Sequence, residues 1–215
     1  MLALALGAAC STEPKRDPPF DGDTALMPGE EFAYGRSIAA RVCADKELVE
    51  DRRVREYVAR VGGTVAAASA RPDPYDGWRF YVVRDATVST FSAPCGFVFI
   101  TTGALKASKS EDVLAAMLAQ EMAHSALDHA LEGEPVRDIR PTRESWPYAS
   151  PGAAKIFHGI CDGAARRATG GWTEEQELAA SAWAQEALKR AGYETGGTAP
   201  EIRTKRWQEE LEDLK

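Results

Sequence analysis

The most informative part of this chain is the stretch Ser110-Glu-Asp-Val-Leu-Ala-Ala-Met-Leu-Ala-Gln-Glu-Met-Ala-His124. It is dominated by alanine, leucine and methionine, which favour helix, and its few polar side chains mean that most of its surface must be buried. Ser108 and Glu111 fit a capping box at its start. We therefore expect a long, largely buried helix from about residue 109 to Leu131.

The end of this expected helix carries the pattern Gln120-Glu-Met-Ala-His124, which bears on metal chemistry. In zinc helices with the motif His-Glu-x-x-His, two histidines one turn apart bind the metal, and the glutamate polarises the attacking water. Glu121 and His124 keep that spacing, but Gln120 occupies the position of the first histidine. A Glu-x-x-His pattern on a helix is by itself weak evidence for a metal site, so we interpret it together with the flanking sequence.

Segments that favour strands lie before this helix, and further helices surround them. Residues 78–83 and 96–102 are rich in aromatic and β-branched residues and are bounded by turn formers, and residues 88–91 suit a third strand. Apolar spacing and capping residues predict five further helices: 30–44, 48–70, 153–168, 173–191 and 201–215. The proline-rich residues 132–152 are predicted to form a loop, of a length that is usually functional or mobile.

The composition is typical of a folded domain and argues against two classes of protein. The chain has 215 residues, of which 44% are hydrophobic and 27% are charged. Its net charge of −7 argues against a nucleic-acid-binding protein, which needs a basic face to neutralise phosphates. No apolar run approaches the roughly 18 residues that a membrane-spanning helix requires.

The first residues are similar to a targeting signal. Residues 1–10 form a short apolar stretch that closes on small residues and Cys10, as at the end of a bacterial lipoprotein signal peptide. In that interpretation Cys10 carries a lipid, and the protein sits on the periplasmic face of a membrane in the bacterial cell envelope. The alternative is an apolar N-terminus with an incidental cysteine. The proline-rich residues 11–30 are a predicted tether for a domain at 31–200, which the helix 201–215 follows.

Three further cysteines are present, and with Cys10 lipidated they form an odd set: Cys43, Cys95 and Cys161. In an oxidising compartment such a set favours one disulfide and one free thiol. The sequence does not indicate which two of these cysteines would form the disulfide.

Three motifs occur in the order found in one family of enzymes. The hairpin Ser89-Thr-Phe-Ser-Ala-Pro-Cys-Gly96 leads into a strand, and the helix with Gln120-Glu-Met-Ala-His124 follows. A later helix, capped by Thr173 and Gln176, carries Glu177-Leu-Ala-Ala-Ser181. Together they resemble the zinc metallopeptidases of the CAAX prenyl protease and heat-shock protease HtpX type, and in particular their exported bacterial members. The resemblance covers roughly residues 30–195.

This resemblance implies a role for each residue at the matching positions. His124 and Glu177 would be zinc ligands, Glu121 would be the general base, and Gln120 stands where the family has its first histidine ligand. Ser181 replaces an aspartate that supports the zinc site in the family. Both replacements weaken the site, because a neutral amide is a poor zinc ligand and the loss of even a supporting residue costs about 10–100-fold in affinity or activity.

Other side chains near these motifs allow two interpretations. His158 and Cys161 lie three residues apart on an expected helix, and Cys95 lies in the hairpin, so a site rebuilt with one of them is conceivable. The simpler interpretation, which we favour, is that His129 is a surface or capping residue and His158 is half-buried. Cys95 and Cys161 then pack or pair.

The resemblance implies an α+β fold, in which a small, mostly antiparallel sheet packs against several helices and the active-site helix follows the sheet. A substrate peptide would add to the sheet edge as an extra strand. One implied function is a membrane-tethered zinc endopeptidase with a weakened metal site, in which Glu121 acts as base toward a zinc-activated water on envelope proteins or peptides. The alternative is an inactive pseudopeptidase that binds peptides or partner proteins through the retained groove.

Overall fold

The computed structural model describes residues 26–136 and 150–194, and its elements confirm the α+β class. In chain order these elements are α1 (Pro28–Val42), α2 (Arg52–Ala68), β1 (Arg79–Val83), β2 (Thr90–Ala93), β3 (Phe97–Thr101), α3 (Thr102–Ala107), α4 (Glu111–Ala126), the 3₁₀ helix η1 (His129–Leu131), α5 (Pro151–Gly170) and α6 (Glu174–Ala191). The strands precede α4, as expected from the sequence.

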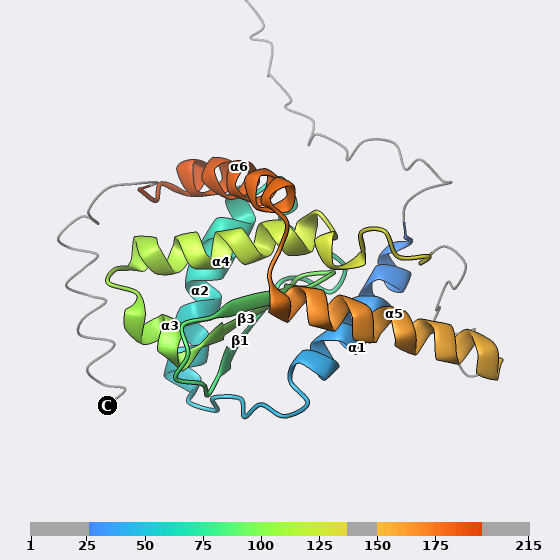
Figure 1. The fold of residues 1–215 in the computed structure, drawn as a ribbon. Helices are drawn as coiled ribbons and strands as arrows, with labels where there is room; N and C mark the ends of the chain where they lie inside the picture. The colour runs from blue at the N-terminus through green and yellow to red at the C-terminus, as the bar shows by residue number, and fades with distance from the viewer. Residues whose placement is uncertain (1–25, 137–149, 195–215) are drawn as a thin grey trace, which may run out of the picture.

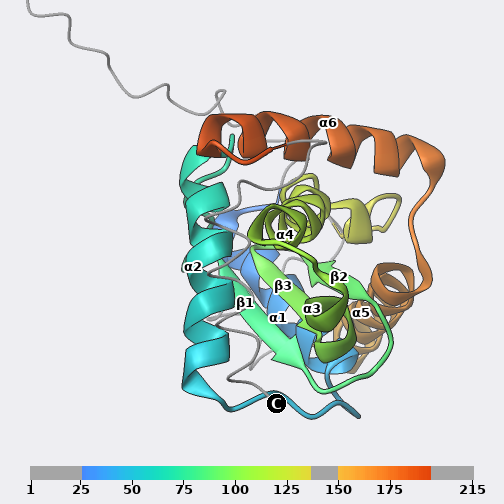
Figure 2. The ribbon, with the colours of Figure 1, turned by 90° about the vertical axis from the view of Figure 1, so that its left-hand side faces the viewer.

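The three strands form one mixed sheet in the order β1-β3-β2 (Figure 2). The central strand β3 pairs in parallel with β1 and in antiparallel fashion with β2. Every residue of β3 is buried, because helices cover both faces of the sheet. β2 begins two residues later than the predicted strand 88–91, and within the described ranges it has a strand partner on one side only.

Helices cover the two faces of the sheet with different side chains (Figures 1 and 2). On one face Val98 and Ile100 pack against α2 and α4, and α6 packs on both of these helices. On the other face Phe97 and Phe99 pack against α1 and α5. α4 thus lies between the sheet and α6, which explains why its sequence is apolar on almost every side.

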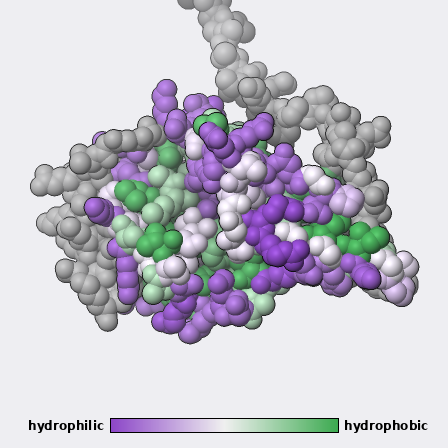
Figure 3. Space-filling model, viewed as in Figure 1, coloured by the Kyte–Doolittle hydropathy of each residue, from purple (hydrophilic) through white to green (hydrophobic). Residues whose placement is uncertain are grey.

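The outer surface is mixed in character. The face drawn in Figure 3 is mainly hydrophilic, with smaller hydrophobic areas between. Large exposed hydrophobic side chains lie on separate elements, for example Ile156 on α5 and Leu178 on α6. Among the residues that the structure describes, no helix combines the length and the apolar character needed to cross a membrane.

The start of α4 differs from the prediction. Ser110, not Ser108, is its N-cap, and the Ser110 side chain accepts a hydrogen bond from an amide of the first turn. Ser108 instead ends α3, where its hydroxyl donates to the Ala104 carbonyl. The short helix α3 was not predicted, because the pattern of the strand 96–102 runs on into it. The Thr101 side chain caps α3 and so ends the strand.

The end of α4 is also earlier than predicted. The helix stops at Ala126 and not at Leu131. Asp128 has a left-handed backbone with φ of 53°, which breaks the helical path. Residues 129–131 then form the short helix η1 in a new direction.

Several predicted segments lie outside the described residues. They are 1–10 with Cys10, most of the tether 11–30, most of the loop 132–152, and the helix 201–215. α1 begins at Pro28, close to the predicted start of the domain. The domain boundaries therefore stay predictions.

The disulfide expected under oxidising conditions is absent, because Cys43, Cys95 and Cys161 are all free thiols. They lie at the end of α1, in the turn between β2 and β3, and on α5, respectively. Burial raises the pKa of Cys43 to about 11 and the pKa values of Cys95 and Cys161 to about 12. These thiols are therefore protonated and weakly nucleophilic at neutral pH.

Candidate metal and catalytic site

Two helices that are far apart in the sequence, α4 and α6, form the site. They pack side by side in both views of the ribbon (Figures 1 and 2). Ala180 and Ala184 of α6 are buried, and their small side chains let α6 come close to its neighbours. The small residues at 179–182 predict this close approach, although Ala179 and Ala182 themselves are exposed.

Gln120 on α4 contacts both Glu177 and Ser181 on α6. Its amide nitrogen Nε2 donates a 2.8 Å hydrogen bond to Glu177 Oε2. The Ser181 hydroxyl donates to the amide oxygen Oε1 of Gln120 at 3.4 Å. A carboxylate accepts only and so selects the nitrogen end of the amide, which leaves the oxygen end for the hydroxyl. The two contacts together fix which end of Gln120 faces Glu177.

His124 lies one turn further along α4, with its ring almost fully buried. Its Nε2 atom lies 3.5 Å from Glu177 Oε2 and has no hydrogen-bond partner in this part of the chain. Its Nδ1 atom lies 2.8 Å from Nδ1 of His129, and its ring stacks on Trp172 with 4.5 Å between ring centroids. Burial lowers the pKa of His124 to about 4, so the imidazole is neutral at pH 7, the form that binds metals.

The prediction that His129 is a surface or capping residue is wrong. Its ring is buried against His124 and Trp172. The left-handed turn at Asp128 brings His129 to this position, and no pattern in the sequence predicts that turn. Trp172 comes from the segment between α5 and α6, so its contact with the site depends on the path of the chain and was not foreseen.

Glu121 points from α4 towards the edge strand β2. The Thr90 hydroxyl donates a 2.8 Å hydrogen bond to Glu121 Oε1, whereas Oε2 is buried without a partner in the described structure. Burial raises the pKa of Glu121 to about 7; the hydrogen bond from Thr90 opposes this rise, and the nearby charge of Glu177 adds to it. A carboxyl group with such a pKa can accept a proton near neutral pH. No local sequence pattern links Thr90 to Glu121, because only the pairing of β2 brings the two side chains together.

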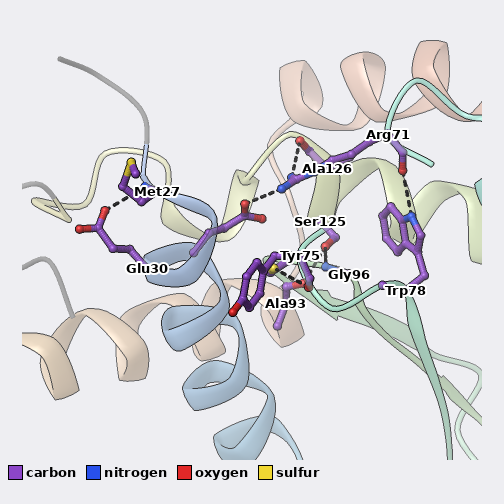
Figure 4. Close-up of polar contacts among 12 residues, drawn as sticks. Met27, Glu30, Arg71, Tyr75, Trp78, Ala93, Gly96, Ser125 and Ala126 are labelled. Atoms are coloured by element: carbon purple, nitrogen blue, oxygen red, sulfur yellow. Dashed lines mark hydrogen bonds and ion pairs between the residues drawn. The ribbon is translucent and has the colours of Figure 1, made fainter. Parts of the chain in front are cut away.

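The hairpin between β2 and β3 is bound to α4 through Ser125 (Figure 4). The Ser125 hydroxyl donates to the Ala93 carbonyl at 2.7 Å and accepts from the Gly96 amide at 2.9 Å. Gly96 has a φ of +83°, a conformation that glycine adopts without strain. These contacts hold the edge strand in a fixed position against the helix that carries the site.

The donor atoms fit a zinc ion only in part. His124 Nε2 and Glu177 Oε2 converge, and both are good zinc ligands. The third position presents the amide NH₂ of Gln120, which donates hydrogen bonds and cannot coordinate a cation. Residues 26–136 and 150–194 contain no group of three or more His, Cys, Asp or Glu residues that could hold a metal. The site therefore does not fit a tightly bound zinc ion.

The candidate replacement ligands lie in other parts of the fold. His158 on α5 is exposed, not half-buried as expected, and lies 2.8 Å from the guanidinium of Arg41 on α1. Cys161 is buried in the core that α1 and α5 share, and the Cys95 thiol contacts the Tyr75 carbonyl. In the described part of the chain none of the three belongs to a metal-binding group. A metal site rebuilt around them is therefore not supported.

Comparisons with known proteins find sequence similarity to metallopeptidases. The sequence model of peptidase family M48 matches residues 52–199. Over 76 residues the chain is 42% identical to the mitochondrial metalloendopeptidase OMA1 of Schizosaccharomyces pombe, which covers 35% of this chain and 22% of that protein. Over 136 residues it is 23% identical to the putative β-barrel assembly-enhancing protease of Vibrio cholerae, which covers 60% of this chain and 28% of that protein. The matched parts thus span less than a third of the length of either relative.

Proposed function

Because the chain belongs to peptidase family M48, we propose that it is a protein of metallopeptidase fold that binds polypeptides and has lost tight zinc binding. Metallopeptidases of this family depend on zinc. The observation that carries the proposal is the hydrogen bond from the Gln120 amide to Glu177. It joins two positions at which the family motif has metal ligands, so a hydrogen bond takes the place of a shared metal.

Zinc binding at these positions has costs that a histidine at position 120 would not impose. The charge-assisted hydrogen bond between Gln120 and Glu177 must break, and the amide must turn so that Oε1 faces the ion. Ser181 then loses its acceptor. The ligand gained is a neutral amide oxygen, which zinc binds less well than imidazole, thiolate or carboxylate. We expect the zinc affinity to be lower than it would be with histidine at position 120. The difference should be at least about 10–100-fold, which is the effect of losing a supporting residue alone.

The edge strand β2 supports polypeptide binding. Within the described residues β2 pairs with β3 alone, so its other edge has no strand partner. An extended peptide that adds to such an edge gains backbone hydrogen bonds whatever its sequence. Ser125 already holds the hairpin against α4, so binding there requires little further ordering of the protein.

The same proposal includes a place in the cell. We infer that Cys10 carries a lipid that tethers the protein to a membrane of the bacterial envelope, where it acts on envelope proteins or peptides. The small residues before Cys10 support this inference, as does the name of one relative, which refers to β-barrel assembly. A Cys10→Ser variant is expected to leave the membrane fraction for the soluble fraction. A variant that stays with the membrane would contradict the lipid anchor.

A zinc endopeptidase with weak metal binding is the second candidate, and Glu121 favours it. The carboxyl group is buried, with a pKa of about 7, and Thr90 holds it in place. These are the properties of a general base. A protein that only binds polypeptides has no evident use for a buried, half-paired carboxyl group, which is costly to keep.

A binding and cleavage experiment with a fluorescent unfolded polypeptide separates the two candidates. For the binding protein we expect the same affinity, within about twofold, with a chelator and with added zinc, and no cleavage in either condition. Cleavage that requires zinc and disappears in Glu121→Gln would establish the enzyme instead. A failure to bind any unfolded polypeptide would remove the proposed function.

A further inference from the structure

A groove of about 690 Å³ opens beside the site. It lies between the start of α1, the segment after α2, the turn from α4 to η1, and the start of α6. His129 lines this groove and touches His124, and Gln176, the neighbour of Glu177, lines it as well. The groove therefore adjoins the candidate site, but none of the residues at the family's motif positions lines it.

Two carboxylates, Glu31 and Asp128, form the polar part of its wall. The Glu31 side chain is 6% exposed and pairs through Oε2 with the guanidinium of Arg71. The other oxygen, Glu31 Oε1, is buried with no hydrogen-bond partner in the described structure, and so is Asp128 Oδ1. A protonated Asp128 can share its proton with Glu31. When both carboxyl groups are ionised, these oxygens need a cation or another donor, because buried carboxylate oxygens nearly always have a partner.

Arg71 cannot satisfy both carboxylates. It reaches from the segment after α2 to the end of α4, where its guanidinium donates to the Ala126 carbonyl (Figure 4). The guanidinium also donates to Glu31. The backbone carbonyl of Arg71 accepts a hydrogen bond from the Trp78 indole, which fixes the backbone from which the Arg71 side chain extends. One positive charge thus faces two buried carboxyl groups, so Arg71 can balance only one of them when both are ionised.

The other charges around the groove have the same sign. Glu132 and Glu175 lie exposed on its rim. Burial raises the pKa of Asp128 to about 8; the charge of Glu31 and a hydrogen bond between the two side chains add to this rise, whereas Arg71 opposes it. Without a partner cation Asp128 therefore holds a proton that a bound cation would displace.

We propose that this groove binds a basic side chain, lysine or arginine, of the polypeptide, with Glu31 Oε1 and Asp128 Oδ1 accepting hydrogen bonds from its cationic end. The inference rests on the proposed function, since it names the class of polypeptide that the site selects. Leu127 and Leu131 also line the groove and offer an apolar surface for the methylene groups of such a side chain. A metal ion fits less well, because Arg71 stands next to the two carboxylates.

The test compares two peptide pools that are randomised at every position except one, which is arginine in one pool and citrulline in the other. Citrulline has nearly the same shape as arginine but no charge. Each pool competes with the fluorescent unfolded polypeptide for the unmodified protein. We expect the arginine pool to bind about tenfold more tightly, as for a charge-assisted pair in a partly buried site.

The variant Asp128→Asn shows whether the preference arises in this groove. Asparagine tolerates the left-handed backbone of this position, so the turn is kept while the charge is removed. We expect the arginine preference to fall below about twofold. Glu175→Gln on the exposed rim is the matched control and should keep most of the preference.

Each outcome bears on a different claim. Equal binding of the two pools by the unmodified protein would overturn the inference and show that the carboxyl pair merely shares a proton, but the proposed function would stand. If Asp128→Asn keeps the full preference for arginine over citrulline, the preference arises outside this groove, and the inference is overturned as well. If no pool binds, the proposed function fails as well. The comparison on the unmodified protein decides even where the variant does not fold.

Discussion

His124 Nε2 lies 3.5 Å from Glu177 Oε2, although the two side chains belong to different helices. This distance depends on how closely α6 approaches α4. Ala180 of α6 is fully buried and Ala184 is nearly so. Because an alanine adds only a methyl group, these positions leave no room for a larger side chain without moving the helix and Glu177 with it.

The first prediction concerns this helix packing. Ala180→Leu should lower the free energy of unfolding by about 1–3 kcal/mol, because the added atoms have no space in a close-packed core. Ala179→Leu, at the exposed neighbouring position, should change stability by less than about 0.5 kcal/mol. Urea unfolding of both variants measures the difference. Equal stability of the two would mean that α6 does not pack as described.

The second prediction concerns the approach of α1 to the hairpin that holds the site. A Cβ atom added at Gly35 would lie 2.1 Å from the Pro94 carbonyl oxygen, which as backbone cannot rotate away. Gly35→Ala should therefore destabilise the protein by about 1–3 kcal/mol.

Gly159→Ala on α5 is the matched control for this change. Nothing lies within 4 Å of the added atom, and the position is exposed. It should stabilise the helix by about 0.5–1 kcal/mol, because alanine loses less backbone freedom on folding. Opposite shifts of the melting temperature in the two variants are the expected result, and shifts of the same sign would contradict the packing of α1 on the hairpin.

The parts of the site that follow from local sequence are the parts that could be predicted. The capping residues Thr173 and Gln176 fix the start of α6, and the helical period then places Glu177 and Ser181 on adjacent turns. On α4 the spacing from Gln120 to His124 is one turn. Small residues on α6 made it reasonable to expect the two helices in contact, and Gln120 does meet Glu177.

The contacts that were missed depend on tertiary structure. Thr90 reaches Glu121 because β2 is the edge of the sheet, and an edge cannot be read from three short strands. His129 contacts His124 because the chain changes direction at Asp128, a non-glycine residue with a left-handed backbone conformation. Ser108 and Ser110 are equally good caps by type, and only the presence of α3 assigns each to its helix.

The third prediction follows from the pKa of Glu121. In the unfolded chain this carboxyl group ionises near its ordinary pKa of 4.5, whereas burial in the folded protein raises the pKa to about 7. Between these values the folded protein binds the extra proton, so its stability falls as the pH rises from about 4.5 to about 7. Glu121→Gln lacks this proton, and its stability relative to the unmodified protein should increase over that range.

Urea unfolding at pH 5 and at pH 8, with a chelator present, measures this effect. The gain of Glu121→Gln over the unmodified protein should be larger at pH 8, by on the order of 1–3 kcal/mol. The exposed Glu175→Gln serves as control and should show no comparable change with pH. Parallel pH profiles for Glu121→Gln and the unmodified protein would mean that the carboxyl group is not buried as described.

The last prediction tests the proposal that Gln120 and Ser181 prevent tight zinc binding. Gln120→His should place an imidazole beside His124 and Glu177, and so complete a set of three good zinc ligands. Ser181→Asp should tighten zinc binding further by supporting that imidazole. We expect the unmodified protein to hold zinc weakly or not at all and the double variant to hold about one equivalent, measured by elemental analysis after purification without added zinc.

Two further measurements separate a restored site from nonspecific binding. Zinc should raise the melting temperature of the double variant, because a ligand that binds only the folded state stabilises it. In that background Glu121→Gln should keep the zinc and abolish any peptidase activity gained, because this residue is a base and not a ligand. Tight, stoichiometric zinc in the unmodified protein would contradict the loss of the site. A double variant that still binds no zinc would show that Glu177 does not act as the third ligand, although its Oε2 atom lies 3.5 Å from His124 Nε2.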